Sequence, residues 1–150
     1  MDKTQEAVRR IIWAINKIDG VYYYFARHLG INENALTFLY ALGDGKSHSQ
    51  KEVSDEWLIP RTTINTIVKN MVSDGYIAFD PEQHTKEKTI MLTEKGRSYA
   101  DKLMSSIYAA EEKAMKDTVE RFSPEFISAL EHFSGCFFGE YSKVISDVQL

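Results

Sequence analysis

Hydrophobic residues recur at spacings of three and four over most of the chain, which is the period of an amphipathic α-helix. The first such stretch predicts a long helix from Thr4 to about His28. Asn32 then offers an N-cap for a short second helix, and the glycine-rich segment 43–45 ends it. The pattern up to residue 45 therefore predicts two helices.

The middle of the chain predicts two further short helices joined by a tight turn. Ser49 and Glu52 have the spacing of a capping box, and the helix that they start runs to about Trp57. Pro60 marks the next start, because proline is tolerated in the first turn of a helix. This fourth helix separates apolar from polar positions. Its apolar face consists of Ile64, Ile67, Val68 and Met71, and its polar face of Arg61, Thr62, Asn65, Thr66 and Lys69.

Downstream of the fourth helix, two short β-prone runs, 76–79 and 89–92, flank a polar segment and predict a hairpin with a long loop. Thr93 then caps a long helix with a heptad-like seam, and Pro124 opens a last helix with a broad aromatic stripe. The seam consists of Gly96, Ala100, Leu103, Ile107, Ala110 and Ala114. The stripe consists of Phe126, Leu130, Phe133, Phe137, Tyr141, Val144 and Val148.

The predicted fold is mainly α with a small β-hairpin wing. A compact winged helix-turn-helix core, from Asn32 to Leu92, lies between long helices at both ends of the chain. These terminal helices carry more apolar surface than such a core needs, and exposed apolar stripes commonly mark association. We therefore expect a homodimer, the alternative being that the terminal helices pack only on each other within one chain.

The polar face of the fourth helix has the chemistry of a DNA-reading surface. Its Arg, Thr, Asn and Lys side chains offer donors and acceptors that suit base edges and phosphates, and it has no acidic residue before Asp74. Amides at the start of the preceding capped helix can hold a phosphate. A merely solvated face is the alternative, but the short turn before this helix and the hairpin after it favour a helix-turn-helix.

Four segments resemble the MarR family of winged helix-turn-helix regulators, namely SQKEV (49–53), IPRTTINTIVKNM (59–71), DGYI (74–77) and LTEKG (92–96). The resemblance runs nearly end to end. It implies an obligate homodimer with interlocked terminal helices. It also implies binding to a pseudo-palindromic site in double-stranded DNA, more often as a repressor than as an activator.

The expected organisation is one intertwined domain with an N-terminal dimerisation helix (1–31), a DNA-binding domain (32–95) and C-terminal dimerisation helices (96–150). Bases are expected to contact Arg61, Thr62, Thr63, Asn65 and Thr66. The DNA backbone is expected to contact Gln50, Lys69 and the wing residues His84, Lys86 and Lys88.

The predicted wing departs from the family pattern. Family wings usually carry an aspartate and arginines near the tip, whereas residues 80–88 read DPEQHTKEK and contain no arginine. Lysine supplies a point charge but not the planar fork that suits a narrow minor groove. We therefore expect weaker reading of the minor groove than is usual in the family.

Aromatic residues crowd the first two predicted helices, where the resemblance implies a small aromatic or anionic effector. The candidate lining residues are Trp13, Tyr22 and Phe38. Core packing is the alternative, because aromatic residues at helical spacing more often form core than pocket.

Neither thiol nor metal sensing is expected, and no cofactor is predicted. The single cysteine, Cys136, cannot form an internal disulfide or a cysteine-rich zinc site, and its apolar neighbours are typical of an inert thiol. The four histidines are scattered, and we expect no histidine or cysteine pair with metal-ligand spacing on one helix.

The net charge of −4 is compatible with a nucleic-acid partner because of how the charges are distributed. Residues 1–45 hold five basic and five acidic groups, residues 46–102 hold nine and nine, and residues 103–150 hold four and eight. The excess negative charge therefore lies outside the predicted DNA-binding region.

The remaining composition indicates a globular, cytosolic protein with one sizeable core. Of 150 residues, 43% are hydrophobic, no apolar run approaches the ~20 residues of a membrane span, and no signal peptide is seen. No phosphate-binding loop, nucleophile elbow or H-E-x-x-H motif is present, so an enzyme is not expected. The alternative from another class is a winged-helix adapter that binds protein and not DNA. Such an adapter has no need of Arg61, Asn65 and Lys69 on one face.

Overall fold

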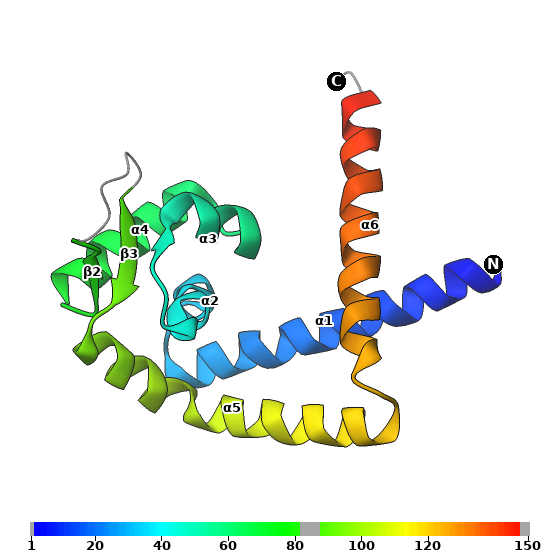
Figure 1. Cartoon of the computed structure of the whole chain (residues 1–150), viewed down its shortest axis with the longest axis horizontal. Helices are drawn as coiled ribbons and strands as arrows, with labels where there is room; N and C mark the ends of the chain where they lie inside the picture. The colour runs from blue at the N-terminus through cyan, green and yellow to red at the C-terminus, as the bar shows by residue number, and fades with distance from the viewer. Residues whose placement is uncertain (1, 82–87, 148–150) are drawn as a thin grey trace. The chain divides into compact units, whose positions relative to one another are not determined.

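The computed structural model describes residues 2–81 and 88–147. Its main-chain contacts divide the chain into a unit of residues 1–105 and a unit of residues 106–150, with the boundary inside one long helix. The elements of the described residues are α1 (Lys3–Leu29), α2 (Glu33–Ala41), the 3-10 turn η1 (Leu42–Asp44), β1 (His48–Ser49), α3 (Gln50–Trp57), α4 (Arg61–Ser73), β2 (Ile77–Phe79), β3 (Thr89–Leu92), α5 (Glu94–Arg121) and α6 (Glu125–Asp147) (Figure 1).

The predicted class, mainly α with a small antiparallel sheet, is confirmed, but the sheet has a strand that the sequence pattern did not predict. Strand β1 pairs with β3 through His48 opposite Ile90, so the order across the sheet is β1-β3-β2. In the predicted hairpin, Ile77 lies opposite Leu92 and Phe79 opposite Ile90. A strand of two residues is too short to show an alternating pattern, so β1 could not be recognised from the sequence.

Side-chain caps start the first three helices, α1, α2 and α3. The Asp2 carboxylate accepts hydrogen bonds from two backbone amides of α1, and the Asn32 side chain accepts two from α2. At α3 the predicted capping box is present: the Glu52 amide donates to Ser49 Oγ at 3.1 Å, and the Ser49 amide donates to Glu52 Oε2 at 2.6 Å. These bonds satisfy amides that have no partner inside their own helix.

The core of the unit 1–105 is formed by side chains from α2, α3, α4, β3 and α5. The largest of these fully buried side chains are Phe38, Leu39, Leu42, Val53, Ile59, Ile64, Ile90 and Met104. Helix α2 packs against α1, α3 and α4, and α4 also packs against β2. The predicted inward face of α4 is confirmed, since all four of its apolar residues are buried. Burial of this face fixes the rotation of α4 about its axis.

The turn between α3 and α4 is held by one buried hydrogen bond. Ser54 Oγ donates to the carbonyl oxygen of Ile59 at 2.8 Å, and both residues are buried. Leu58, between them, adopts a left-handed conformation with φ 52° and leaves 74% of its side chain exposed. Pro60 then occupies the N-cap position of α4, where its missing amide hydrogen costs nothing. This short turn sets where α4 begins.

The start of α5 is locked to the end of α4. Thr93 Oγ1 donates to the Gly75 carbonyl at 2.7 Å and accepts from the Gly96 amide at 2.9 Å, which confirms Thr93 as the cap of α5. A Cβ atom on Gly96 would lie 1.8 Å from the carbonyl oxygen of Tyr76. Only glycine lets α5 approach the backbone this closely.

In the unit 106–150, the helices expose most of their apolar side chains. The α6 stripe is exposed or half-buried along its described length, and Val148 lies outside the described residues. In the heptad-like seam Ile107 is buried, whereas Ala110 and Ala114 are exposed. Among the described residues, no helix is long and apolar enough to cross a membrane.

Replacement of Gly96 by alanine should destabilise the fold. Because the new methyl group would overlap the Tyr76 carbonyl, α5 must shift away from the end of α4, and we expect a loss of about 1–3 kcal/mol in the free energy of unfolding. Urea denaturation followed by circular dichroism measures this loss. Gly135→Ala is the matched control, because no atom lies within 4 Å of a Cβ at that position on α6. Equal stability of the two variants would contradict the close approach at Gly96.

Candidate nucleic-acid interface

The outward face of α4 carries the residues that the sequence predicted to contact DNA. Arg61, Thr62, Asn65, Thr66 and Lys69 are all exposed, and no carboxylate lies on this helix. Its amino-terminal end follows the turn fixed by Ser54. The surface is therefore polar and basic, and it projects from a rigidly packed helix.

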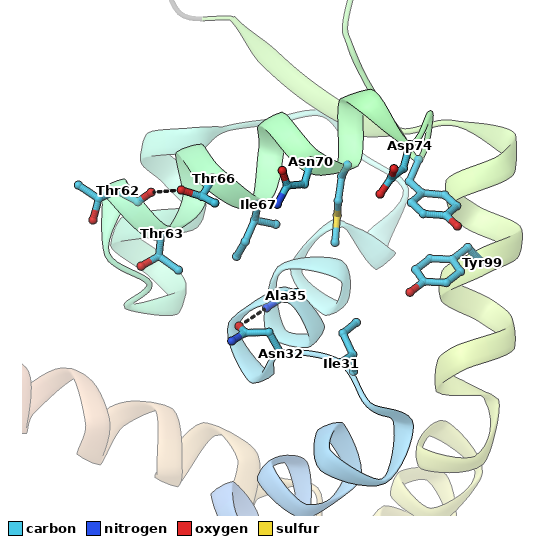
Figure 2. Close-up of a pocket in the computed structure, with 12 residues that line it drawn as sticks. Ile31, Asn32, Ala35, Thr62, Thr63, Thr66, Ile67, Asn70, Asp74 and Tyr99 are labelled. Carbon is cyan, nitrogen blue, oxygen red and sulfur yellow. Dashed lines mark hydrogen bonds between the residues drawn. The ribbon is translucent and has the colours of Figure 1, made fainter.

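Two threonines of the predicted set have environments that change their expected role. Thr66 Oγ1 donates to the carbonyl oxygen of Thr62 at 3.2 Å, so its hydroxyl proton is occupied within the helix and its oxygen remains an acceptor. Thr63 is half-buried, and its side chain is turned to the flank of α4 that faces α2 (Figure 2). The hydrogen-bond donors that remain on the outward face are Arg61, Asn65, Lys69 and the Thr62 hydroxyl.

The flank of α4 forms one wall of an open pocket of about 570 Å³, whose other walls come from the start of α2 and from α5 (Figure 2). Tyr76 and Tyr99 stack at one end of it with ring centroids 4.2 Å apart and an interplanar angle of 11°. Burial raises the pKa of the Tyr99 phenol, and the nearby Tyr76 and Asp74 raise it further. Tyr99 therefore stays protonated and neutral at physiological pH. Lys95 caps the stack, with Nζ 4.8 Å from the Tyr76 ring centroid.

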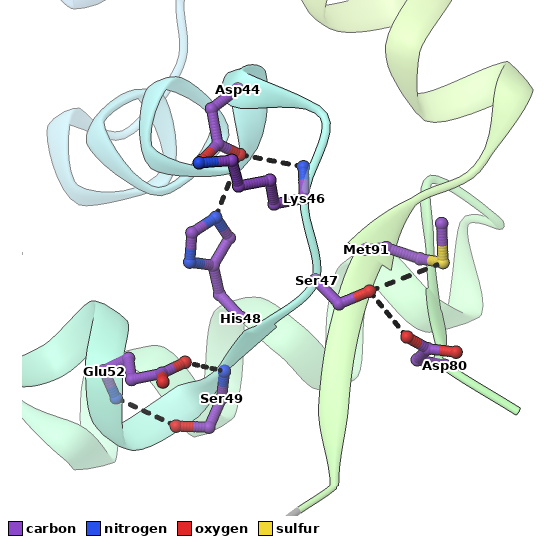
Figure 3. Close-up of polar contacts among 8 residues, drawn as sticks. All are labelled: Asp44, Lys46, Ser47, His48, Ser49, Glu52, Asp80 and Met91. Atoms are coloured by element: carbon purple, nitrogen blue, oxygen red, sulfur yellow. Dashed lines mark hydrogen bonds and ion pairs between the residues drawn. The ribbon is translucent and has the colours of Figure 1, made fainter. Parts of the chain in front are cut away.

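The base of the wing is attached to β1 by a polar contact that the sequence did not reveal. Ser47 Oγ donates to Asp80 Oδ2 at 2.7 Å and lies 3.9 Å from Met91 Sδ (Figure 3). The Asp80 amide also donates to the Thr89 carbonyl at 2.9 Å. These bonds fix the outgoing end of β2 relative to α3, which begins one residue after β1. Ser47 and Asp80 are 33 positions apart, so no local pattern could pair them.

On the other side of β1, Asp44 Oδ1 lies 2.9 Å from His48 Nε2 (Figure 3). The hydrogen bond from His48 lowers the pKa of the Asp44 carboxyl, and the bond from the Lys46 amide lowers it further. This contact closes the turn between η1 and β1. It therefore supports the strand that holds the wing.

The remaining predicted DNA-contacting residues are placed as follows. Gln50 is half-buried at the start of α3. Lys88 is exposed beside the wing, with Nζ 5.5 Å from the ring centroid of Phe79 on the neighbouring strand, a contact that sequence reasoning missed. His84 and Lys86 lie outside the described residues.

The structure does not bring the three predicted effector-contacting residues together. Phe38 is fully buried in the core, which corrects its assignment as a pocket residue, and Trp13 exposes 64% of its side chain on α1 and lines no described pocket. Tyr22 does line a pocket, between α1, α2 and the end of α3. Helical spacing alone cannot distinguish a core aromatic from one that lines a cavity.

One expectation about Cys136 is wrong. Its side chain is exposed, and its Sγ lies 3.5 Å from His132 Nε2, one turn earlier on α6. The two residues therefore form a pair with metal-ligand spacing on one helix. Among the described residues, no group of three or more His, Cys, Asp or Glu side chains could hold a metal ion.

Comparisons with known proteins agree with this geometry. Residues 29–86 match the family model described as the MarR family, whereas no curated protein matches the chain. Among solved structures, NMB1585, a MarR family regulator from Neisseria meningitidis, has a TM-score of 0.74 at 22% identity and covers 98% of this chain and 99% of its own. A MarR family transcriptional regulator from Listeria monocytogenes, complexed with 26mer DNA, has a TM-score of 0.70 at 19% identity. It covers 95% of this chain and 96% of its own.

A third solved structure, NadR in complex with 4-hydroxyphenylacetate, has a TM-score of 0.65 at 14% identity and covers 85% of this chain and 88% of its own. At these identities the structural comparisons establish the fold. The family match covers α2 to the start of the wing, where the capping box, the turn before α4 and α4 itself lie. The chain therefore has the winged-helix fold of these MarR family structures, and its residues 29–86 match the model of that family.

Proposed function

We propose that this chain is a homodimeric repressor that binds a pseudo-palindromic operator and inserts α4 into the DNA major groove. The observation that carries the proposal is the outward face of α4, where Arg61, Asn65 and Lys69 are exposed without a neighbouring carboxylate on the helix. A winged-helix adapter would not require this surface. The Listeria regulator of the same fold, complexed with DNA, supports the proposal.

The proposed contacts divide by chemistry. Arg61 and Asn65 can each make two hydrogen bonds to the edge of a purine base, whereas Lys69 supplies a point charge to a phosphate. We assign Thr62, Thr63 and Thr66 to weaker contacts at the rim, because Thr66 donates internally and Thr63 is half-buried. Gln50, His84, Lys86 and Lys88 are assigned to the DNA backbone.

The homodimer is proposed from apolar surface that each unit leaves exposed. On α6, Phe137 and Phe138 expose 57% and 61% of their side chains, and on α1 Trp13 and Ile18 expose 64% and 53%. A monomer rarely leaves so many large apolar side chains on its helices, and a second copy of the same chain would cover them. We keep the proposed division into dimerisation helices (1–31 and 96–150) and a DNA-binding domain (32–95).

We also propose that a small molecule regulates DNA binding. NadR, which has the same fold, is seen with 4-hydroxyphenylacetate. In this chain the pocket lined by Tyr22 joins α1, which is proposed to dimerise, to the helices that carry the recognition helix. A ligand there would contact both parts.

Replacement of Arg61 by alanine should abolish the preference for operator DNA. The measurement is the fluorescence anisotropy of a labelled duplex from the region upstream of the gene, compared with a scrambled duplex at one fixed salt concentration. We expect the wild type to prefer its own region by about 10³-fold or more. Arg61→Ala should lose about 1–3 kcal/mol of binding free energy, mostly from the specific complex.

Arg10→Ala is the matched control, because Arg10 is exposed on α1, away from the recognition helix, and its loss should leave the preference unchanged. If the wild type binds both duplexes equally, or if both variants behave alike, α4 is not the reading surface and the adapter function is favoured.

Replacement of Phe137 by glutamate should weaken the dimer. The substitution places two charges in the proposed apolar interface, one from each copy, and unpaired buried charges are strongly unfavourable. Sedimentation equilibrium should show a dimer for the wild type and at least a tenfold higher dissociation constant for Phe137→Glu. Ser128→Glu adds the same charge to the opposite side of α6 and should remain dimeric. A wild-type monomer would refute the homodimer.

A further inference from the structure

The pocket between α1, α2 and the end of α3 has a volume of about 590 Å³ and an unusual lining. Three of its residues are aromatic: Tyr22 from α1, Tyr40 from α2 and Trp57 from the last turn of α3. The Tyr22 and Tyr40 rings meet edge to face with centroids 6.0 Å apart, and the Tyr40 and Trp57 rings are 5.6 Å apart and tilted by 59°. These rings are set at steep angles to one another, so they present faces in several directions.

Two carboxylates also line the pocket, together with the neutral polar residues Asn34 and Thr37. Asp19 lies on α1 and Glu33 in the first turn of α2, and both are exposed. No lysine, arginine or histidine lines the pocket, so its described lining has a formal charge of −2. Two basic residues of α1 contact aromatic rings that do not line this pocket. Lys17 Nζ is 4.7 Å from the Trp13 ring centroid, and the Arg27 guanidinium is 5.7 Å from the Tyr23 ring centroid.

The three aromatic rings and the two carboxylates together favour a positively charged ligand. The face of an aromatic ring is the negative part of its quadrupole and attracts a cation within about 6 Å, and Trp is the most effective ring. The two carboxylates add attraction for the same sign of charge and repel an anion. Leu36 and Ile59 supply apolar surface for the rest of the ligand. A pocket for a carboxylate or a phenolate would instead favour a basic side chain, and none is present in this lining.

We propose that this pocket binds a small organic cation, a protonated or quaternary amine with an apolar body, and that this cation is the effector of the regulator. The proposal replaces the aromatic or anionic effector expected from the family resemblance. It rests on the proposed function only for its consequence, a change in DNA binding, and not for the binding of the cation itself.

The pocket has a direct structural connection to the recognition helix. Ile59 lines the pocket, accepts the Ser54 hydrogen bond and directly precedes Pro60, the N-cap of α4. Trp57 lies two residues earlier, at the end of α3. A ligand held between α1 and these residues therefore contacts the turn that sets where α4 begins. Its occupancy should change the affinity for operator DNA.

The two tryptophans allow a direct binding test. Trp13 lines no described pocket, so the Trp13→Phe chain keeps Trp57 as its one tryptophan and reports on this pocket alone. Benzyltrimethylammonium is the probe, with neutral benzyl alcohol and anionic phenylacetate as comparators. We expect a saturable change in Trp57 fluorescence with the cation and at least about tenfold weaker binding of both comparators.

Removal of the two carboxylates tests the role of charge. Asp19→Asn with Glu33→Gln, in the Trp13→Phe chain, should weaken cation binding by about tenfold and leave benzyl alcohol unaffected. Asp101→Asn with Glu112→Gln makes the same change in net charge at exposed positions outside the pocket and should have no effect. The proposal is overturned if the cation gives no saturable change, if phenylacetate binds as tightly, or if the two double variants behave alike.

Measuring the affinity for operator DNA with and without the cation tests the cation pocket separately from the proposed DNA-binding function. Saturating benzyltrimethylammonium should change the affinity of the wild type for operator DNA at least threefold, whereas Arg61→Ala should still bind the cation. Cation binding by a chain that does not bind DNA would support the pocket and refute the DNA-binding function. Cation binding that leaves DNA affinity unchanged would overturn the effector role, and DNA binding without cation binding would overturn the pocket.

Discussion

The burial of one face of α4 is the constraint on which the rest of the structure depends. Ile64 is completely buried, and Ile67, Val68 and Met71 are each at most 8% exposed. Because a helix has 3.6 residues per turn, burial of these four positions forces the intervening polar residues outward. Rotation of α4 about its axis would expose apolar side chains at a cost of about 1.5–3 kcal/mol for each one that is fully exposed. The polar surface that is proposed to face DNA is therefore fixed by the apolar packing behind it.

The connections around this helix rest on a few hydrogen bonds, one at each junction. Ser54 holds the turn before α4, Thr93 joins the end of α4 to α5, and Ser47 attaches the base of the wing to β1. Each is a short polar side chain, and two of the three donate to a backbone carbonyl. Three aromatic side chains, Tyr22, Tyr40 and Trp57, line the pocket between α1, α2 and the turn before α4.

The sequence predicted those parts of the molecule that depend on local pattern. Helix α2 starts after Asn32, and α3 starts after Ser49 and ends at Trp57, as the caps and the spacing predicted, because a cap acts within a few residues. The buried and exposed faces of α4 follow for the same reason. The pairing of Ser47 with Asp80 and the strand β1 depend on residues far apart in the chain, so no spacing could predict them. The pocket likewise takes its walls from three separate helices.

The most direct test of the account is hydrogen–deuterium exchange of the full chain with and without its upstream DNA. If packing fixes α4 as the reading surface, DNA should slow exchange of the backbone amides at the start of α3 and along α4, and leave those of α6 unchanged. The predicted result is protection confined to α3, α4 and the wing. Protection concentrated on α6, or no protection of α4 by DNA that binds, would contradict the assignment of α4 as the recognition helix.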